Sequence, residues 1–154
     1  MNKEEIIKQL KIDEGFMPVA KWDKKQFTYG YGCRAPREGA KITEKEAAVV
    51  LSKRVDEACE QFENIFFGHR NKFNDVRENA FVNMVFNMGP GKKGRPECGG
   101  LQSFVKTLAL IVNNKVVPWG QVANELRDSG WYHQVGRRAV RIINEIKTGI
   151  KTGG

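Results

Sequence analysis

The sequence has no apolar segment that approaches the about 20 residues needed to cross a bilayer, which argues against a transmembrane helix. Its first residues, Met1-Asn2-Lys3-Glu4-Glu5, are charged and lead into an amphipathic segment, so we expect no secretory signal peptide. Internal repeats and a separate linker are also missing, and 154 residues suffice for one ordinary domain. These absences predict a chain that is made in the cytoplasm and does not insert stably into a membrane.

Cysteine is scarce as well. Cys33, Cys59 and Cys98 are far apart, and neither a CxxC pair nor a Cys/His spacing suited to zinc occurs. We interpret the three residues as free thiols of a protein made in a reducing cytosol. The sequence therefore predicts no metal site and no cofactor.

Positive charge, in contrast, is plentiful. The chain has 26 Lys and Arg residues against 18 Asp and Glu residues, for a formal net charge of +8. Such a charge favours a polyanionic partner, and nucleic acid, an anionic membrane surface and an anionic cell-wall polymer all fit it. The basic residues are scattered, however, which is also the pattern of an ordinary soluble surface. A nucleic-acid recognition motif or a concentrated basic helix is missing, so nucleic acid is not the expected partner.

Hydrophobic periodicity predicts a small β-containing part followed by a helical part. Residues 3–13 have the period of an amphipathic helix that Gly15 can end, and residues 16–33 have the pattern of a small hairpin or meander. Thr43 and Glu46 form a capping box that opens a long helix ending near Gly68. The later part is expected to hold a helix over 76–88 capped by Asn74, a glycine-rich loop over 89–100, helices over 101–113, 119–128 and 136–147, and a Gly-Trp-Tyr-His turn before the last of them.

Three residues of the first part have the chemistry of a glycosidase. Glu14 lies where a helix ends, and the negative end of the helix dipole disfavours the anionic carboxylate, which suits a proton donor. Asp23 lies on a solvated turn, where it stays ionised, and Thr28 offers a hydroxyl that can hold water. Two carboxylates and such a hydroxyl can hydrolyse a glycosidic bond. Each residue also has an ordinary alternative, as a surface acid, a turn aspartate and a strand threonine.

The segment from Glu14 to Gly32, which ends in Thr28-Tyr29-Gly30-Tyr31-Gly32, resembles the active-site region of phage-type lysozymes, glycoside hydrolase family 24. Residues 42–47, 83–89 and 131–141 look like three later blocks of that family, in the same order. The resemblance implies an α+β, predominantly α, lysozyme-like fold within a single domain, 1–154. A small hairpin or meander lobe at about 14–42 would be joined by a long helix to a helical lobe at about 66–154, which would include the N-terminal helix.

The resemblance also implies an activity. It predicts an endolysin, a monomeric, metal-free muramidase that cleaves the β-1,4 bond between N-acetylmuramic acid and N-acetylglucosamine in peptidoglycan glycan strands and lyses the cell. It would reach the wall from the host cytoplasm through a pore formed by another protein. Glu14 takes the general-acid position, Asp23 that of the second carboxylate and Thr28 that of the water-positioning hydroxyl.

Three further residues receive expected roles. Arg138 takes the position of an arginine that pairs with the catalytic glutamate across the lobes. Because a guanidinium favours the carboxylate anion, we expect it to orient Glu14 more than to keep that group protonated. Tyr29 and Tyr31 are predicted to line the cleft, whereas most other aromatic residues are expected to pack in the core.

Two features depart from the family pattern. Family members usually have one more residue between the aspartate and the threonine, and a usual histidine after Gly-x-Gly is replaced by Cys33. The shorter turn leaves open a lytic transglycosylase acting on the same bond, and an inactive wall-binding module of the same fold is a further alternative. A cysteine hydrolase would need a histidine base, for which only His69 and His133 exist.

Overall fold

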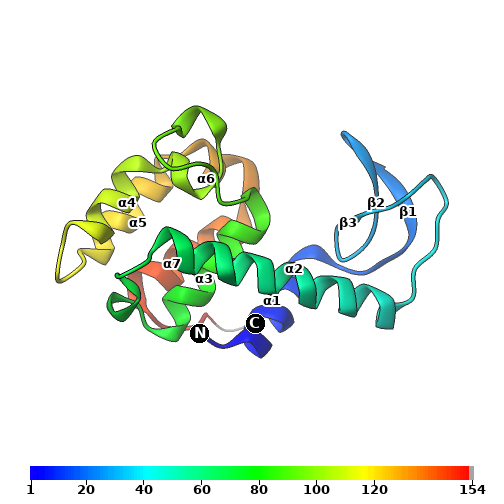
Figure 1. Ribbon diagram of the computed structural model, residues 1–154, viewed down its shortest axis with the longest axis horizontal. Coiled ribbons are helices and arrows are strands. Elements are labelled where there is room, and N and C mark those ends of the chain that lie inside the picture. Colours follow the sequence, from blue (N-terminus) through cyan, green and yellow to red (C-terminus); the bar gives the residue numbers. More distant parts are fainter. Residues whose placement is uncertain (153–154) are drawn as a thin grey trace. The chain divides into compact units, whose positions relative to one another are not determined.

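The computed structural model describes residues 1–152 and divides the chain into two compact units. One is Lys3–Glu57, and the other is Met1–Asn2 together with the residues from Ala58 onward. The division falls within the long helix α2, Glu44–Ile65, and the units are described separately below. Within residues 1–152 the structure has seven α-helices and one three-stranded antiparallel sheet (Figure 1), which confirms the α+β, predominantly α class. The expected lobe boundaries of a single domain stay a prediction.

The first unit contains helix α1, Lys3–Glu14, and the sheet, whose strands are β1, Met17–Asp23, β2, Gln26–Gly30, and β3, Cys33–Arg34. The strands follow one another in the order β1-β2-β3, as a meander does (Figure 1). Helix α1 buries Ile6 and Leu10 on its apolar face. The hairpin or meander expected for residues 16–33 is therefore confirmed.

Helix α2 begins as its capping box predicts. The Glu46 amide donates to the Thr43 hydroxyl at 3.1 Å, and the Thr43 amide donates to the Glu46 carboxylate at 3.0 Å. The two bonds satisfy amides that the first turn of a helix leaves without an intrahelical acceptor. They also hold the pKa of Glu46 below its usual value, because both the backbone and the side chain of Thr43 bond the charged form.

The second unit is helical. Its helices after α2 are α3, Asp75–Met88, α4, Val105–Val112, α5, Trp119–Arg127, α6, Gly130–Val135, and α7, Arg137–Thr148. The Asn74 side chain caps α3 by accepting from the Arg77 amide at 2.9 Å, as expected. Helix α3 buries the run from Ala80 to Val85 and packs against α7, while α7 also packs against α5. The unit also contains an aromatic cluster, in which neighbouring ring centroids lie 4.9–5.6 Å apart. Its rings are those of Phe62, Phe66, Phe73 and Phe81, the last of them on α3.

Two expectations for this unit are wrong in detail. The helix expected over 101–113 is a 3₁₀ turn, Leu101–Ser103, followed by α4, because the backbone of Phe104 leaves the helical region at ψ 66°. The expected Gly-Trp-Tyr-His turn is instead the short helix α6. Ser129 caps it by accepting from the Tyr132 amide, and Trp131 is buried, so capping and burial outweigh the poor helix propensity of Gly130. Within residues 1–152 no helix combines the length and apolarity needed to cross a membrane.

Candidate active site

The Glu14 carboxyl lies against the turn between β2 and β3. Glu14 is the last residue of α1, and Gly15, with φ +70°, ends the helix by donating its amide to the Lys11 carbonyl at 3.0 Å. A Cβ atom placed on Gly32 would lie 3.0 Å from Glu14 Oε2. Gly32 also has φ +78°, a backbone conformation that favours glycine. The second glycine of the Gly-x-Gly motif therefore provides the space that the Glu14 carboxyl occupies.

Asp23 and Thr28 lie on the same face of the sheet. In the antiparallel pairing of β1 with β2, Lys21 is opposite Thr28 and Asp23 is opposite Gln26. Cross-strand partners share a face and side chains alternate along a strand, so Asp23 and Thr28 are diagonal neighbours. Such neighbours are roughly 7–8 Å apart. Asp23 is exposed, whereas Thr28 is only 5% exposed, so the two polar groups differ strongly in their contact with solvent.

The turn between these residues is short and conformationally unusual. Only Lys24 and Lys25 separate the paired residues Asp23 and Gln26. Lys24 has φ +53°, and among residues 1–152 it is the one non-glycine residue with a positive φ. The Lys25 amide donates to the Asp23 carbonyl, which closes a turn tighter than a β-turn. The short turn thus places a left-handed residue directly beside Asp23, and Asp23 and Thr28 share a face of the sheet.

Tyr31 is buried rather than exposed at a surface. Its side chain is 6% exposed, and its hydroxyl donates to Glu44 Oε1 at 2.8 Å. Lys11 Nζ reaches the same oxygen at 3.3 Å, and an Arg54 guanidinium nitrogen donates to the Tyr31 carbonyl at 3.2 Å. Burial raises the pKa of Tyr31, while the hydroxyl of Tyr31 and the ammonium of Lys11 lower the pKa of Glu44. These contacts, from α1 and α2, fix the residue that directly precedes Gly32.

Tyr29 lies on the opposite face of β2 from Thr28, because the two residues are adjacent in the strand. It is half-buried and packs with Phe27 against a small cluster of Ala20, Ala35 and Ala40. The pairing therefore does not bring Tyr29 to the face that carries Asp23. That Tyr29 and Tyr31 line a substrate cleft stays a prediction.

Cys33 has the environment of a structural thiol. It is half-buried, its Sγ atom donates to the Tyr29 carbonyl at 3.4 Å, and no disulfide involves it within residues 1–152. Burial raises the pKa of the thiol, with an opposing contribution from Arg54. A nucleophilic cysteine needs the reverse shift. His69 and His133 belong to the other unit, and no group of three or more His, Cys, Asp and Glu side chains suited to a metal ion occurs among the described residues.

Arg138 lies in the second unit, on the first turn of α7. Its Nε atom donates to Asn83 Oδ1 at 2.9 Å, and Asn83 is a buried polar residue of α3 with 4% exposure. This bond joins two of the blocks that carry the family resemblance. Arg138 and Glu14 belong to different units, so their pairing stays a prediction.

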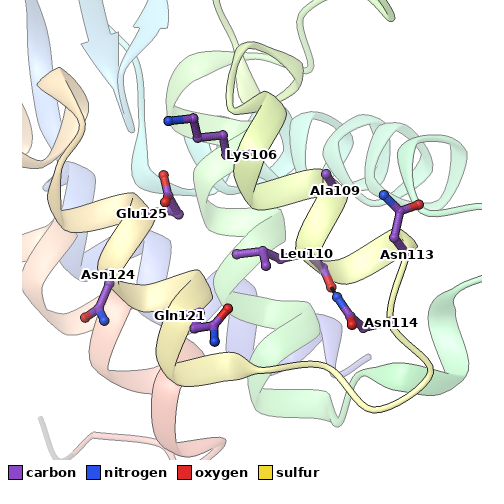
Figure 2. A pocket seen from close by; sticks show the side chains of 8 residues that line it. All are labelled: Lys106, Ala109, Leu110, Asn113, Asn114, Gln121, Asn124 and Glu125. Carbon is purple, nitrogen blue, oxygen red and sulfur yellow. Dashed lines mark hydrogen bonds between the residues drawn. The ribbon is translucent and has the colours of Figure 1, made fainter.

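A hollow of about 600 Å³ also occurs in the second unit, between α4 and α5. Figure 2 shows Lys106 and Leu110 on α4 and Gln121, Asn124 and Glu125 on α5 around it. Ala109, Asn113 and Asn114 complete the lining. Half of the lining residues therefore have amide side chains. None of the residues predicted to act in catalysis lines this hollow.

Two features of the first unit escaped the sequence analysis. The contact between Gly32 and the Glu14 carboxyl and the cluster of Tyr31, Glu44 and Lys11 both join residues far apart in the chain. The only local signal for the first was the Gly-x-Gly spacing, which shows that a side chain is missing but not what fills the space. The second had no local signal, because Lys11 and Glu44 look like ordinary charges on helix surfaces.

Comparison with known proteins agrees with these observations. The family model described as phage lysozyme matches residues 11–140. A probable T4-type lysozyme 1 of Dictyostelium discoideum is 30% identical over 111 residues, which cover 70% of this chain and 58% of that protein. A probable T4-type lysozyme 2 of the same organism is 34% identical over 79 residues, covering 51% and 40%. The chain thus spans little more than half of the first relative's length. The residues that the family model matches include Glu14, Asp23, Thr28 and Arg138. Because the match covers most of the chain, this chain belongs to the phage lysozyme family.

Proposed function

We propose that this protein acts on bacterial peptidoglycan as a glycoside hydrolase, cleaving the β-1,4 bond between N-acetylmuramic acid and N-acetylglucosamine. The observation that best supports the proposal is the placement of Glu14. Its carboxyl ends a helix and lies against a glycine backbone, within the unit whose sheet carries Asp23 and Thr28 on one face. Membership of the phage lysozyme family supports the same class of substrate.

In the proposed reaction, Glu14 donates a proton to the glycosidic oxygen while the Thr28 hydroxyl orients a water molecule. Asp23 is exposed at the end of β1, where its carboxylate can activate that water or offset the positive charge developing on the sugar. Attack from the face opposite the leaving group would invert the anomeric centre. An inverting reaction needs the two carboxyl groups roughly 6.5–9.5 Å apart, whereas a retaining one needs about 5–5.5 Å.

The proposal extends to the biological setting. The enzyme would leave a host cytoplasm through a pore formed by another protein and so reach the cell wall. Its cleavage of the wall would then lyse the cell. The net charge of +8 would then favour its retention on an anionic wall.

Glu14→Gln tests the proposal, with Asp13→Asn as the matched control one residue earlier in α1. We expect Glu14→Gln to clear outer-membrane-permeabilised cells at a rate lower by about 10²–10⁴, the usual contribution of a general acid, with unchanged circular dichroism. Asp13→Asn should retain most activity. Equal clearing by wild type and Glu14→Gln would refute the assignment of Glu14.

Mass spectrometry of the digested wall identifies the reaction. Reducing ends support hydrolysis, and 1,6-anhydro products would identify a lytic transglycosylase instead. A folded wild-type protein that binds wall but releases no fragments would be a binding module.

A further inference from the structure

The hairpin of β1 and β2 carries an exposed indole, that of Trp22. It lies on the face of the sheet opposite the one that carries Asp23 and Thr28. Trp22 is 62% exposed although it is one of the largest apolar side chains. It pairs with Phe27 across the strands, and the two rings meet edge-to-face with centroids 5.2 Å apart. This contact supports the Trp22 ring from one side and leaves most of it exposed, so the hairpin presents a flat aromatic surface.

Two exposed lysines form the adjoining turn. Lys24 and Lys25 connect β1 with β2, and no ion pair within residues 1–152 joins either of them to an acidic side chain. Asp23, the acidic residue next to them, lies on the opposite face of the sheet from Trp22 because the two are neighbours in β1. Trp22 and the two exposed lysines thus lie together at one end of the hairpin.

This combination fits a glycan that carries carboxylates. The apolar faces of pyranose rings stack on aromatic rings, and an exposed Trp is the side chain best suited to that contact. Lysine ammonium groups attract carboxylates, and the stem peptides of peptidoglycan carry several. A lipid surface fits less well, because Trp22 is the one exposed apolar side chain of the segment 21–26, and interfacial binding grows with buried apolar area.

We propose that Trp22, with Lys24 and Lys25, forms an accessory site for a second glycan strand of the insoluble wall. The inference rests on the proposed function for its ligand. Because Trp22 and Asp23 lie on opposite faces of the sheet, a strand stacked on Trp22 is not the strand being cleaved. Binding a neighbouring strand keeps the enzyme on a solid substrate between cleavages and raises the local concentration of bonds to cut.

Co-sedimentation with purified insoluble peptidoglycan tests the site, in the Glu14→Gln background so that the wall stays intact. Trp22→Ala should weaken binding about tenfold, the effect of losing one central aromatic contact. Phe67→Ala is the matched control, since Phe67 is 86% exposed and lies in the other unit. Changing both Lys24 and Lys25 to Gln should reduce the salt dependence of binding more than the same change at the exposed residues Lys53 and Lys115.

Activity provides a second measurement. In the otherwise wild-type enzyme, Trp22→Ala should lower the ratio of the rate on insoluble wall to the rate on a soluble oligosaccharide. The proposal is overturned if Trp22→Ala binds wall as tightly as Phe67→Ala does, or if it loses binding only to anionic phospholipid vesicles. Wall binding that depends on Trp22 in a protein that cleaves no wall would support the accessory site and refute the proposed hydrolase, so the two failures are distinguishable.

Discussion

Replacing Gly32 by alanine is the sharpest test of how the Glu14 carboxyl is positioned. The new Cβ would lie 3.0 Å from Glu14 Oε2, closer than a carbon and an oxygen normally approach, so the carboxyl has to shift by a few tenths of an ångström. The backbone adds a second cost, because φ at this position is +78°. An L-residue in such a left-handed conformation costs about 1–2 kcal/mol.

Gly39→Ala separates the two effects. Gly39 belongs to the same unit and has φ +75°, but an added Cβ there would meet no atom within 4 Å. Both variants should therefore lose about 1–2 kcal/mol of stability, a fall in Tm of about 2–8 °C for a protein of this size. Only Gly32→Ala should also lose catalysis, by roughly threefold to tenfold, because a displacement of about 1 Å in a catalytic group can cost a hundredfold and the shift expected here is a few tenths of an ångström.

The measurements are thermal unfolding by circular dichroism and clearing of permeabilised cells, well below the Tm of both variants. At that temperature each variant remains folded, so a difference in clearing reports on the site and not on the folded fraction. If Gly32→Ala clears cells as fast as Gly39→Ala, the contact with Gly32 does not position Glu14 and the reasoning is refuted.

Two further predictions concern side chains that the structure connects over long distances. Arg77→Lys should lower the free energy of unfolding by about 1–2 kcal/mol, measured by urea titration. The Arg77 guanidinium donates to two carbonyls at the end of α7 and stacks 4.6 Å from the centre of the Trp119 ring, and a lysine ammonium cannot replace all of these contacts. Unchanged stability would contradict this. Tyr31→Phe should raise the pKa of Glu44 toward its usual value in an NMR titration, since the Tyr31 hydroxyl is the larger cause of its lowering and Lys11 the smaller. A carboxylate with a lowered folded pKa stabilises the protein above its unfolded pKa and loses that effect as the pH falls through the folded value, so the variant should show a weaker acid dependence of stability; an identical dependence would show that the bond has no energetic role.

The helices and the hairpin could be predicted from sequence because their signals are local. The Thr43–Glu46 capping box and the Asn74 cap each place a donor and an acceptor three residues apart, and the structure contains both sets of bonds. Helix α6 was missed because its cap, Ser129, precedes a glycine, and glycine is a poor helix former. What stabilises α6 is the burial of Trp131 and the bond from its indole nitrogen to Asn87, 44 residues earlier in the chain.

The candidate site shows the same limit. The order and spacing of Glu14, Asp23 and Thr28 pointed to the first unit, and the strand pairing puts the last two on one face. The orientation of Tyr29 could have been derived from its adjacency to Thr28, once the segment was assigned to a strand. The burial of Tyr31 could not, because it depends on Glu44 and Lys11 approaching from two different helices.

The cap of α3 has a second partner, with a consequence for how the helical unit opens. The Asn74 side chain accepts from the Arg77 amide and, with its other end, donates to the carbonyl of Gly149, 75 residues away. Arg77 in turn donates to the carbonyl of Ile146 at 2.7 Å. Fraying of the last turn of α7 would therefore release the first turn of α3, and the reverse also holds. The backbone amides of both turns should exchange with solvent in one shared opening event, as a single cooperative unit of local unfolding that joins the two sequence-distant helix ends.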